Sequence, residues 1–156
     1  MDFDVFLQLM KALEAEHADY VLVGAAALGV HGLVRATEDI DIFVRANPEN
    51  VDRLKRALNA VWSDPEIENI SSGDLAGEYS TVRYVPPTGG IVVDLISRLG
   101  EAFGFDDLEI EDVVLEGQRI RVASPRTLYR MKRDTVRPKD RLDAEALRRR
   151  FGLEDV

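Results

Sequence analysis

The alternation of apolar and polar residues divides the chain into short helices and strands. Apolar residues recur at helical spacing near the start, and Asp2 or Asp4 stands where an N-cap is expected, which predicts an opening amphipathic helix. The apolar face of this helix consists of Phe3, Phe6, Leu7, Met10 and Leu13. Residues 20–24 predict a short buried strand ending in glycine, and the small residues 25–32 predict a short helix.

The middle of the chain adds a second strand and a longer helix. The segment 39–44, DIDIFV, has the length and apolar content of a strand. Pro48 stands at a typical first helical position and begins the predicted helix 48–62. One face of that helix is formed by Val51, Leu54, Leu58 and Val61. The polar, glycine-containing stretch 63–78 predicts a loop or a poorly ordered segment.

The C-terminal half predicts two hairpins followed by two helices. Strands over 79–85 and 90–97 flank the turn PPTGG, and a smaller hairpin occupies 113–124. A serine followed by proline starts a helix over 124–135, and the last helix is expected over 138–152. The order of these elements indicates an α/β (α+β) protein with a small mixed sheet flanked by helices.

Length and composition indicate one globular domain. A chain of 156 residues can bury about 70% of its unfolded surface, so we expect a single domain over 1–156, with 101–156 a C-terminal hairpin and basic helical extension. It has no apolar run near the roughly 20 residues that span a membrane, and its acidic start is unlike a signal peptide. Without cysteine there is no disulfide or thiolate chemistry. We therefore expect a cytoplasmic protein with no membrane partner.

The net charge of −9 hides an uneven distribution. The stretch 119–150 holds twelve basic residues and four acidic ones, whereas the rest of the chain is strongly acidic. Such a basic stretch could face a polyanion or a triphosphate. Equally, it could be a solvated helix face paired with acids elsewhere in the chain.

Two carboxylates stand two residues apart in the apolar segment 39–44. Because side chains alternate along a strand, Asp39 and Asp41 point to one face while Ile40 and Ile42 point into the core. Two charges about 4 Å apart repel by roughly 4 kcal/mol at an effective dielectric constant of about 20. This repulsion favours a cation between the two acids.

Asp94 is the candidate third member of this cluster. It is a lone carboxylate in the apolar segment 90–97, and its strand could lie beside 39–44. Carboxylates are ligands of hard divalent ions such as Mg²⁺, which hold substrate phosphates in their remaining positions. Two other interpretations are open. Asp39 and Asp41 could face solvent on an edge strand with Asp94 unrelated, or the acids could stabilise a structural Ca²⁺ site.

The segment 21–41, VLVGAAALGVHGLVRATEDID, combines a strand, a glycine turn, a short helix and an acidic pair. This arrangement resembles the nucleotidyltransferase superfamily signature. It is most similar to the minimal and abortive-infection (AbiEii-type) nucleotidyltransferases, whose pattern is G-G-x-A followed by H-G-x-x-R-x-T-x-D-I-D. The matching positions are Gly24, Ala25, Ala27, His31, Gly32, Arg35, Thr37, Asp39, Ile40 and Asp41. The later acid of the family corresponds to Asp94, and its C-terminal motif resembles Lys132 followed by Arg137, Lys139, Asp140 and Asp143.

The resemblance implies a polymerase-beta-like nucleotidyltransferase fold and a metal-dependent enzyme. Such an enzyme would transfer a nucleoside monophosphate from an NTP to a hydroxyl of RNA, protein or a small molecule, with Mg²⁺ (or Mn²⁺) as cofactor. It also implies a toxin–antitoxin component with a cognate antitoxin protein as partner. Asp39, Asp41 and Asp94 would be the metal-binding and catalytic residues, with Asp94 accepting the proton of the attacking hydroxyl. The nucleotide-binding residues would be Gly24, Ala25, Arg35, Thr37, Lys132 and Arg137.

Ala25 departs from the family pattern, which has glycine or serine at this position. Alanine keeps the backbone N–H donor at the start of the helix, where phosphates bind, but it lacks the serine hydroxyl and resists a positive φ. The alternative function is therefore a catalytically weak nucleotidyltransferase-like protein that binds a nucleotide or a protein partner.

Several neighbouring residues have a structural interpretation beside the functional one. In the functional interpretation Arg35 braces the acids or contacts a phosphate, and in the structural one it pairs with Glu38 at the surface. Thr37 either caps the strand entry or binds a phosphate oxygen. For His31 we favour helix packing or a hydrogen bond over catalysis, and for Asp140 an ion pair that pins the last helix to the sheet.

Overall fold

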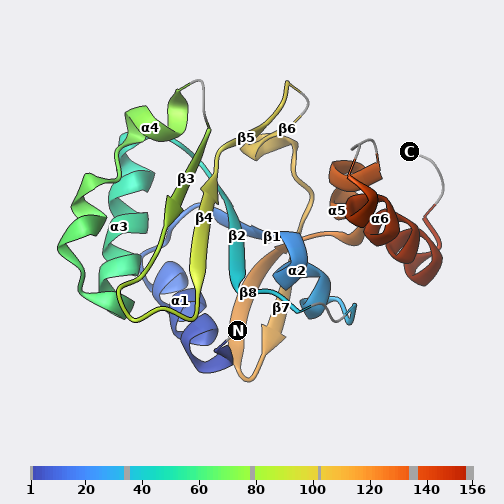
Figure 1. Ribbon diagram of the computed structural model, residues 1–156, viewed down its shortest axis with the longest axis horizontal. Helices are drawn as coiled ribbons and strands as arrows, with labels where there is room; N and C mark the ends of the chain where they lie inside the picture. Colours follow the sequence, from blue (N-terminus) through green and yellow to red (C-terminus); the bar gives the residue numbers. More distant parts are fainter. Residues whose placement is uncertain (1, 34–35, 78–79, 102, 134–136, 154–156) are drawn as a thin grey trace.

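A six-stranded mixed sheet runs through the middle of the protein (Figure 1). The computed structural model describes residues 2–33, 36–77, 80–101, 103–133 and 137–153. The strand order is β3-β4-β2-β1-β8-β7, with β2–β4 and β1–β8 parallel and the other neighbours antiparallel. The strands are β1 (Tyr20–Val23), β2 (Asp39–Val44), β3 (Thr81–Tyr84), β4 (Val92–Ile96), β7 (Ile110–Leu115) and β8 (Gln118–Ala123). The predicted mixed α/β sheet is thus confirmed.

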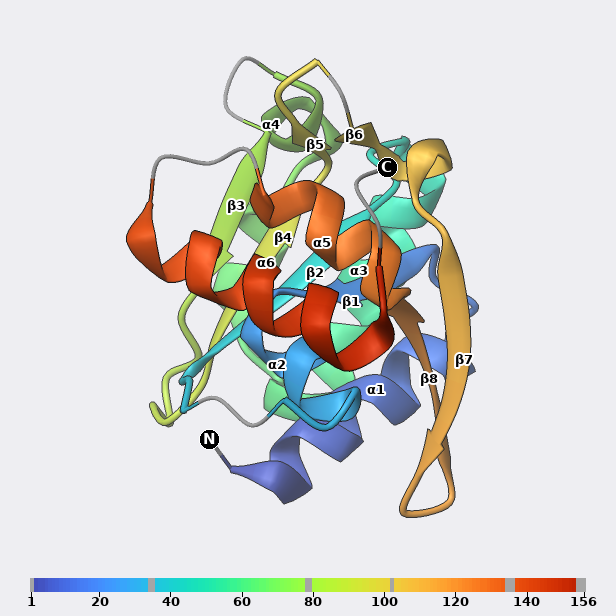
Figure 2. The ribbon, with the colours of Figure 1, turned by 90° about the vertical axis from the view of Figure 1, so that its right-hand side faces the viewer.

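Helices cover both faces of the sheet (Figures 1 and 2). On one face lie α1 (Phe3–Ala15) and α3 (Pro48–Trp62). On the other lie α2 (Gly24–Val30), α5 (Pro125–Arg133) and α6 (Pro138–Phe151). None of the helices in the described part of the chain is both long enough and apolar enough to cross a lipid bilayer.

The helix starts follow the predicted capping signals. The Asp2 carboxylate accepts from the backbone N–H groups of Asp4 and Val5 at the start of α1. Asn47 caps α3, which begins with a proline as expected. Pro138 begins α6, and Gly152 ends it in the left-handed conformation at φ +62°. These caps satisfy backbone groups that a helix leaves unpaired at its ends.

The apolar positions predicted for α1 and α3 form most of the core against β1 and β2. Ile40 and Ile42 of β2 are fully buried, as the strand alternation predicts. Phe3 and Leu7 are the exceptions in α1, because Phe3 is 45% exposed and Leu7 is only partly buried. The core residues of the two helices are Phe6, Leu9, Met10, Leu13, Val51, Leu54, Ala57 and Leu58.

The C-terminal hairpin belongs to the main sheet. β8 pairs in parallel with β1 through Leu22 and Val122, and β7 forms the outer edge. The turn between β7 and β8 lies at Glu116 and Gly117, both at positive φ, as the predicted hairpin requires. Helices α5 and α6 follow this hairpin. The single-domain organisation over 1–156 stays a prediction.

The predicted loop over 63–78 is wrong. It contains a 3₁₀ helix (Pro65–Asn69) and the short helix α4 (Ser72–Ala76). Asp64 and Ser71 cap these turns through their side chains. The turns bury Ile67, Ile70 and Leu75. These apolar residues are too few to give a helical or strand periodicity in the sequence, although their side chains pack into the core.

The structure also contains a short two-stranded ribbon that the sequence analysis did not predict. β5 (Arg98–Leu99) and β6 (Phe103–Gly104) pair in antiparallel fashion and precede a 3₁₀ turn, Phe105–Asp107. Arg45, which follows β2, donates to the Asp106 carboxylate and lies 4.6 Å from the Phe105 ring centroid. The ribbon is therefore attached to the main sheet by long-range contacts that local sequence patterns do not contain.

Asn50 joins the start of α3 to the ends of β1 and β2. It is 1% exposed, and its Oδ1 accepts from the Asp19 N–H at 2.7 Å. Its Nδ2 donates to the carbonyl oxygens of Asp19 at 3.0 Å and Arg45 at 2.8 Å. One side chain thus satisfies three backbone groups, which lie at the start of β1 and at the end of β2.

We expect Asn50→Ala to lower the free energy of unfolding by about 2 to 3 kcal/mol, because it leaves buried backbone groups without partners. Urea unfolding followed by circular dichroism would measure this loss. Asn59→Ala in the same helix is the matched control, because Asn59 is only partly buried, and it should change stability by less than about 0.5 kcal/mol. Equal effects of the two substitutions would contradict the proposed role of Asn50.

Candidate functional site

The parallel pairing of β2 and β4 brings the three predicted acids to one face of the sheet. Asp41 stands directly beside Asp94 in the register, and Asp39 lies two residues earlier on the same face. β2 lies between β4 and β1, so it is an interior strand. The interpretation that places Asp39 and Asp41 on an edge strand is therefore wrong, and the predicted neighbourhood of Asp94 is confirmed.

The glycine turn at the end of β1 packs against the same acids. Val23 is the register partner of Asp41, and Gly24 follows it at φ +68°. A Cβ atom at Gly24 would overlap Asp41 Oδ2. Glycine is thus required here for its conformation and for the space that the carboxylate occupies. Ala25 does not have a positive φ, so alanine causes no backbone strain at its position.

Arg83 completes the cluster, and the sequence reasoning missed it. Its Nε donates to Asp94 Oδ1 at 3.0 Å and its Nη2 to Asp94 Oδ2 at 3.2 Å. The same Nη2 lies 3.9 Å from Asp39 Oδ2. The predicted hairpin gave only a weak signal for this contact, because it placed Arg83 near Asp94 on the paired strand, and the observed register makes the two residues direct partners.

Crowding changes the proton affinity of the central acid. Burial raises the pKa of Asp41 to about 6, with further increases from the charges of Asp94 and Asp39 and from a hydrogen bond with Asp94. Lys132 acts in the opposite direction. The bond and charge of Asp94 raise the pKa of Arg83 above its ordinary value. The face therefore favours bound protons and cations.

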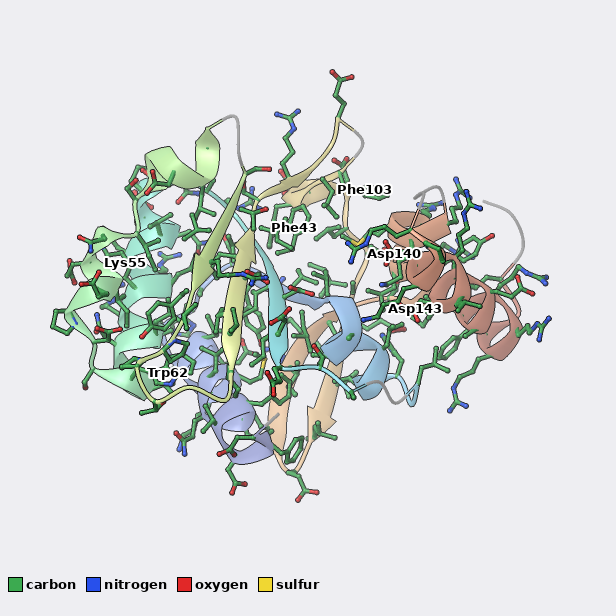
Figure 3. The ribbon with its side chains drawn as sticks, in the orientation of Figure 1. Phe43, Lys55, Trp62, Phe103, Asp140 and Asp143 are labelled. Atoms are coloured by element: carbon green, nitrogen blue, oxygen red, sulfur yellow. The ribbon has the colours of Figure 1, made fainter. Side chains whose placement is uncertain are left out.

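Lys132 reaches this face from α5, but acids of α6 hold it. Its Nζ lies 3.2 Å from Asp140 Oδ1 and 3.1 Å from Asp143 Oδ2, and Asp143 is only 3% exposed. Figure 3 shows Asp140 and Asp143 on the side of α6 that faces the sheet. The predicted ion pair of Asp140 is confirmed, with the correction that these bonds pin α6 to α5 instead of to the sheet. A phosphate contact of Lys132 stays a prediction.

The remaining predicted site residues each have their own contacts. Thr37 caps the strand entry, because its Oγ1 accepts from the Asp39 N–H at 3.1 Å. His31 Nε2 is 2.8 Å from the Ala123 carbonyl oxygen, which confirms a hydrogen-bonded role. The Arg137 side chain is 74% exposed, and its Nε lies 3.7 Å from Asp140 Oδ2. Arg35 lies outside the described residues.

Many bases of the basic stretch pair with acids, as the structural interpretation predicts. Glu145 accepts from both Arg148 and Arg149 on α6, and these bonds lower its pKa to about 2. Arg119 on β8 pairs with Asp112 across the hairpin. The excess positive charge of the C-terminal segment is thus partly neutralised within the chain.

The donor set fits a hard divalent cation in its chemistry. Three carboxylates share one face, and two of them already bind a cation, the Arg83 guanidinium. Within the described ranges, however, no three or more His, Cys, Asp or Glu side chains are arranged as a ligand set for a metal ion. The acids therefore adopt the arrangement that binds arginine, and Asp94 would have to exchange this partner for a metal.

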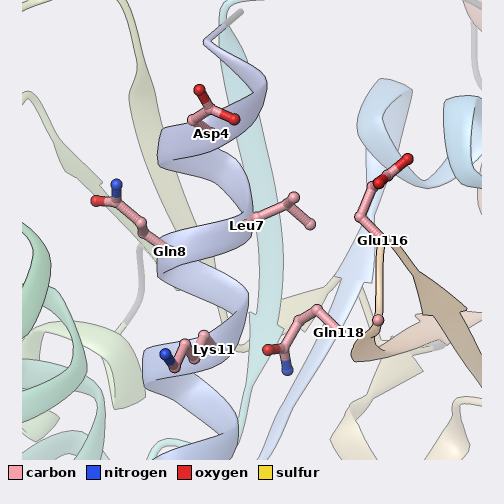
Figure 4. A pocket seen from close by; sticks show the side chains of 7 residues that line it. Asp4, Leu7, Gln8, Lys11, Glu116 and Gln118 are labelled. Atoms are coloured by element: carbon pink, nitrogen blue, oxygen red, sulfur yellow. The ribbon is translucent and has the colours of Figure 1, made fainter.

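Two surface grooves lie beside the sheet. One of about 510 Å³ separates α1 from the β7–β8 turn and is lined by Leu7, Lys11 and Gln118 among others (Figure 4). Another, of about 370 Å³, follows the edge strand β3 and is lined by Asn69, Arg83 and Tyr84 among others.

The sequence matches the model of one protein family, described as the nucleotidyl transferase AbiEii toxin of a type IV toxin–antitoxin system, over residues 8–151. No curated protein matches the chain. The family match covers all the residues of the acidic face.

Two solved structures are similar in fold. A protein from Thermotoga maritima, provisionally assigned as a nucleotidyltransferase, superposes with a TM-score of 0.57 at 18% identity, over 96% of this chain and 92% of that one. An antigenic nucleotidyltransferase-like protein from Paracoccidioides brasiliensis gives 0.55 at 18% identity, over 89% and 71%. At this identity the likeness establishes the fold, which is the predicted nucleotidyltransferase fold.

We expect Gly24→Ala to destabilise the protein by about 1 to 3 kcal/mol, because alanine disfavours positive φ and its Cβ would displace the Asp41 carboxylate. Thermal unfolding would measure the loss. Gly29→Ala in the same helix is the control. No atom lies within 4 Å of a Cβ there, so the change should be neutral or slightly stabilising. A harmless Gly24→Ala would contradict the close packing of Asp41 on the turn.

The raised pKa of Asp41 gives a pH-dependent prediction. Because the folded state holds this proton more tightly than the unfolded state, the ionised carboxyl destabilises the fold as pH rises from about 4 to about 6. Asp41→Asn keeps a donor for Asp94 and should raise the free energy of unfolding by on the order of 2 kcal/mol at about pH 7.5. The gain should disappear near about pH 4.

Urea unfolding across this pH range, in a chelator, would measure the difference between Asp41→Asn and the unsubstituted protein. Asp52→Asn on the exposed side of α3 is the control and should show no such pH dependence. A gain from Asp41→Asn that is constant with pH would argue against the raised pKa.

Proposed function

This chain belongs to the AbiEii nucleotidyl transferase toxin family, and we propose that it moves a nucleoside monophosphate from an NTP to a hydroxyl acceptor in a metal-dependent reaction. The observation that carries this proposal is the convergence of Asp39, Asp41 and Asp94 on one face of β2 and β4, beside the turn at Gly24. A purely structural sheet would gain nothing from this arrangement, because the charges repel and one of them is buried.

In this proposal Asp39, Asp41 and Asp94 hold Mg²⁺ or Mn²⁺. The bound ions would supply electrostatic stabilisation of the attacking and leaving oxygens of the displacement. Metal binding would also shift Asp41 to its ionised form. Its raised pKa comes from burial and from negative neighbours, whose charge a bound cation would neutralise.

Proton transfer from the attacking hydroxyl is assigned to Asp94. Both of its carboxylate oxygens accept hydrogen bonds from Arg83, which also holds the side chain in place. An oxygen that accepts from a guanidinium is a poor base, so Asp94 would act only after Arg83 has released at least one oxygen.

Phosphate binding is assigned to the turn and to the basic helices. Gly24 and Ala25 present backbone N–H groups at the start of α2 without obstructing side chains. Lys132 lies close enough to the acids to lower the pKa of Asp41 and would reach a phosphate by exchanging Asp140 or Asp143 for it. Arg35, Thr37 and Arg137 complete the proposed nucleotide-binding set.

The family description supports a protein partner, whereas the acceptor is proposed from chemistry alone. A type IV toxin–antitoxin system implies a cognate antitoxin, and we propose one as the protein partner. RNA, protein and small molecules are the candidate acceptors, because each offers hydroxyl groups. A cytoplasmic location stays a prediction.

The alternative function is nucleotide or partner binding without efficient catalysis. Arg83 on Asp94 and the two acids on Lys132 favour it, since these two cations are engaged within the chain. Calorimetry separates the two functions. Metal-dependent NTP binding without turnover, or a stoichiometric protein partner without NTP binding, would support the alternative.

Incubation with labelled NTPs, Mg²⁺ or Mn²⁺ and total RNA or protein should transfer label to an acceptor. Asp39→Ala should reduce labelling at least about 100-fold, because it removes a proposed metal ligand. Asp52→Ala on the exposed face of α3 is the control and should keep full activity. Equal labelling by Asp39→Ala and the unsubstituted protein would remove the proposed role of the acidic face.

A further inference from the structure

One basic and two acidic side chains stand in line across three strands at the acidic face. Arg83 of β3 is the register partner of Asp94, and Asp94 is the register partner of Asp41. The exposure of the members differs strongly along this line. The Arg83 side chain is 60% exposed, whereas the Asp94 side chain is only 10% exposed. A nearly buried carboxylate therefore depends on a cation that itself stands mostly in water.

We propose that Arg83 is a competing counter-ion, which binds Asp94 and Asp39 in the metal-free protein and must leave them when a divalent cation binds. This inference rests on the proposed metal dependence and adds a positioning residue to it. While Arg83 is bound, Asp39 and Asp94 would not be arranged to bind a metal ion. Metal binding and the release of Asp94 from Arg83 would therefore occur together.

The contacts support displacement of Arg83 more than displacement of the acids. Its guanidinium makes two hydrogen bonds to Asp94 and a longer contact of 3.9 Å to Asp39. An exposed arginine that leaves these partners regains hydration at once, whereas Asp94 cannot turn to water from its position in the sheet. Release of Arg83 is therefore favourable only when another cation takes its place beside Asp94.

The neighbouring charges restrict what that second cation can be. Asp39, Asp41 and Asp94 face the site from β2 and β4, and Lys132 of α5 is a basic group close enough to act on Asp41. Lys132 is held by Asp140 and Asp143, one of them buried, so its transfer to Asp94 would break both of these ion pairs. A hard divalent ion from solution has no such cost and prefers carboxylate oxygens.

Calorimetric titration of the metal-free protein with MnCl₂ or MgCl₂, without nucleotide, tests the competition. Arg83→Gln removes the competing charge and should tighten divalent binding roughly three- to tenfold. It should also lower the melting temperature in chelator by roughly 2 to 6 °C, because Asp94 loses its partner. Saturating metal should abolish this difference in melting temperature.

Two further variants separate direct competition from net charge. Arg83→Lys keeps the charge but loses the two-pronged contact, and it should bind metal more tightly than the unsubstituted protein and less tightly than Arg83→Gln. Arg98→Gln removes an equal charge from an arginine that donates to the Gly100 carbonyl, and it should leave metal affinity unchanged.

The outcomes separate this inference from the proposed function. Weaker or unchanged metal binding by Arg83→Gln and Arg83→Lys would overturn the competition while leaving metal dependence intact. Equal tightening by Arg98→Gln would reduce the effect to net charge and also overturn it. If the unsubstituted protein binds neither Mn²⁺ nor Mg²⁺, the metal-dependent reaction fails as well. Should Arg83→Gln not fold, the order of affinities is decided by Arg83→Lys alone.

Discussion

The accumulation of negative charge on one face of β2 and β4 is the constraint on which the site depends. Asp94 is almost fully buried, and Asp41 lies beside it in the register with Asp39 on the same face. At low effective dielectric such a group is unstable without positive charge or protons. The protein supplies both, since Arg83 binds Asp94 and the pKa of Asp41 rises to about 6. A face that already needs compensation in this way is suited to binding cations.

Each layer of the fold contributes to holding this face in place. Parallel pairing of β2 with β4 sets the acids side by side, and antiparallel pairing with β1 brings Gly24 against Asp41. Behind the sheet, Asn50 fixes α3 to the ends of two strands. In front, α5 carries Lys132 toward the acids while α6 holds it by ion pairs. The chemistry therefore depends on contacts between segments that are distant in the sequence.

The sequence predicted the elements with strong periodicity and the acids that interrupt it. The segment 39–44 was informative because its carboxylates break an otherwise apolar strand, and the motif 21–41 identified the family. Arg83 was missed because one arginine on an amphipathic strand looks like an ordinary surface residue until hairpin register is considered. The helical turns within 63–78 and the β5–β6 ribbon depend on side-chain caps and distant partners, such as Arg45 on Asp106, which leave no periodic signal.

The turn between β3 and β4 has an influence that its own residues do not show. It contains Gly89 and Gly90 at positive φ, and a Cβ at either would touch nothing, so backbone shape alone selects glycine there. The number of residues in this turn decides which side chain of β3 stands opposite Asp94. A one-residue deletion that shifted the ladder would turn Arg83 to the opposite side of the sheet and present Val82 or Tyr84 instead. A change in the length of this turn therefore changes the charge that faces Asp94, although no ionisable residue is gained or lost.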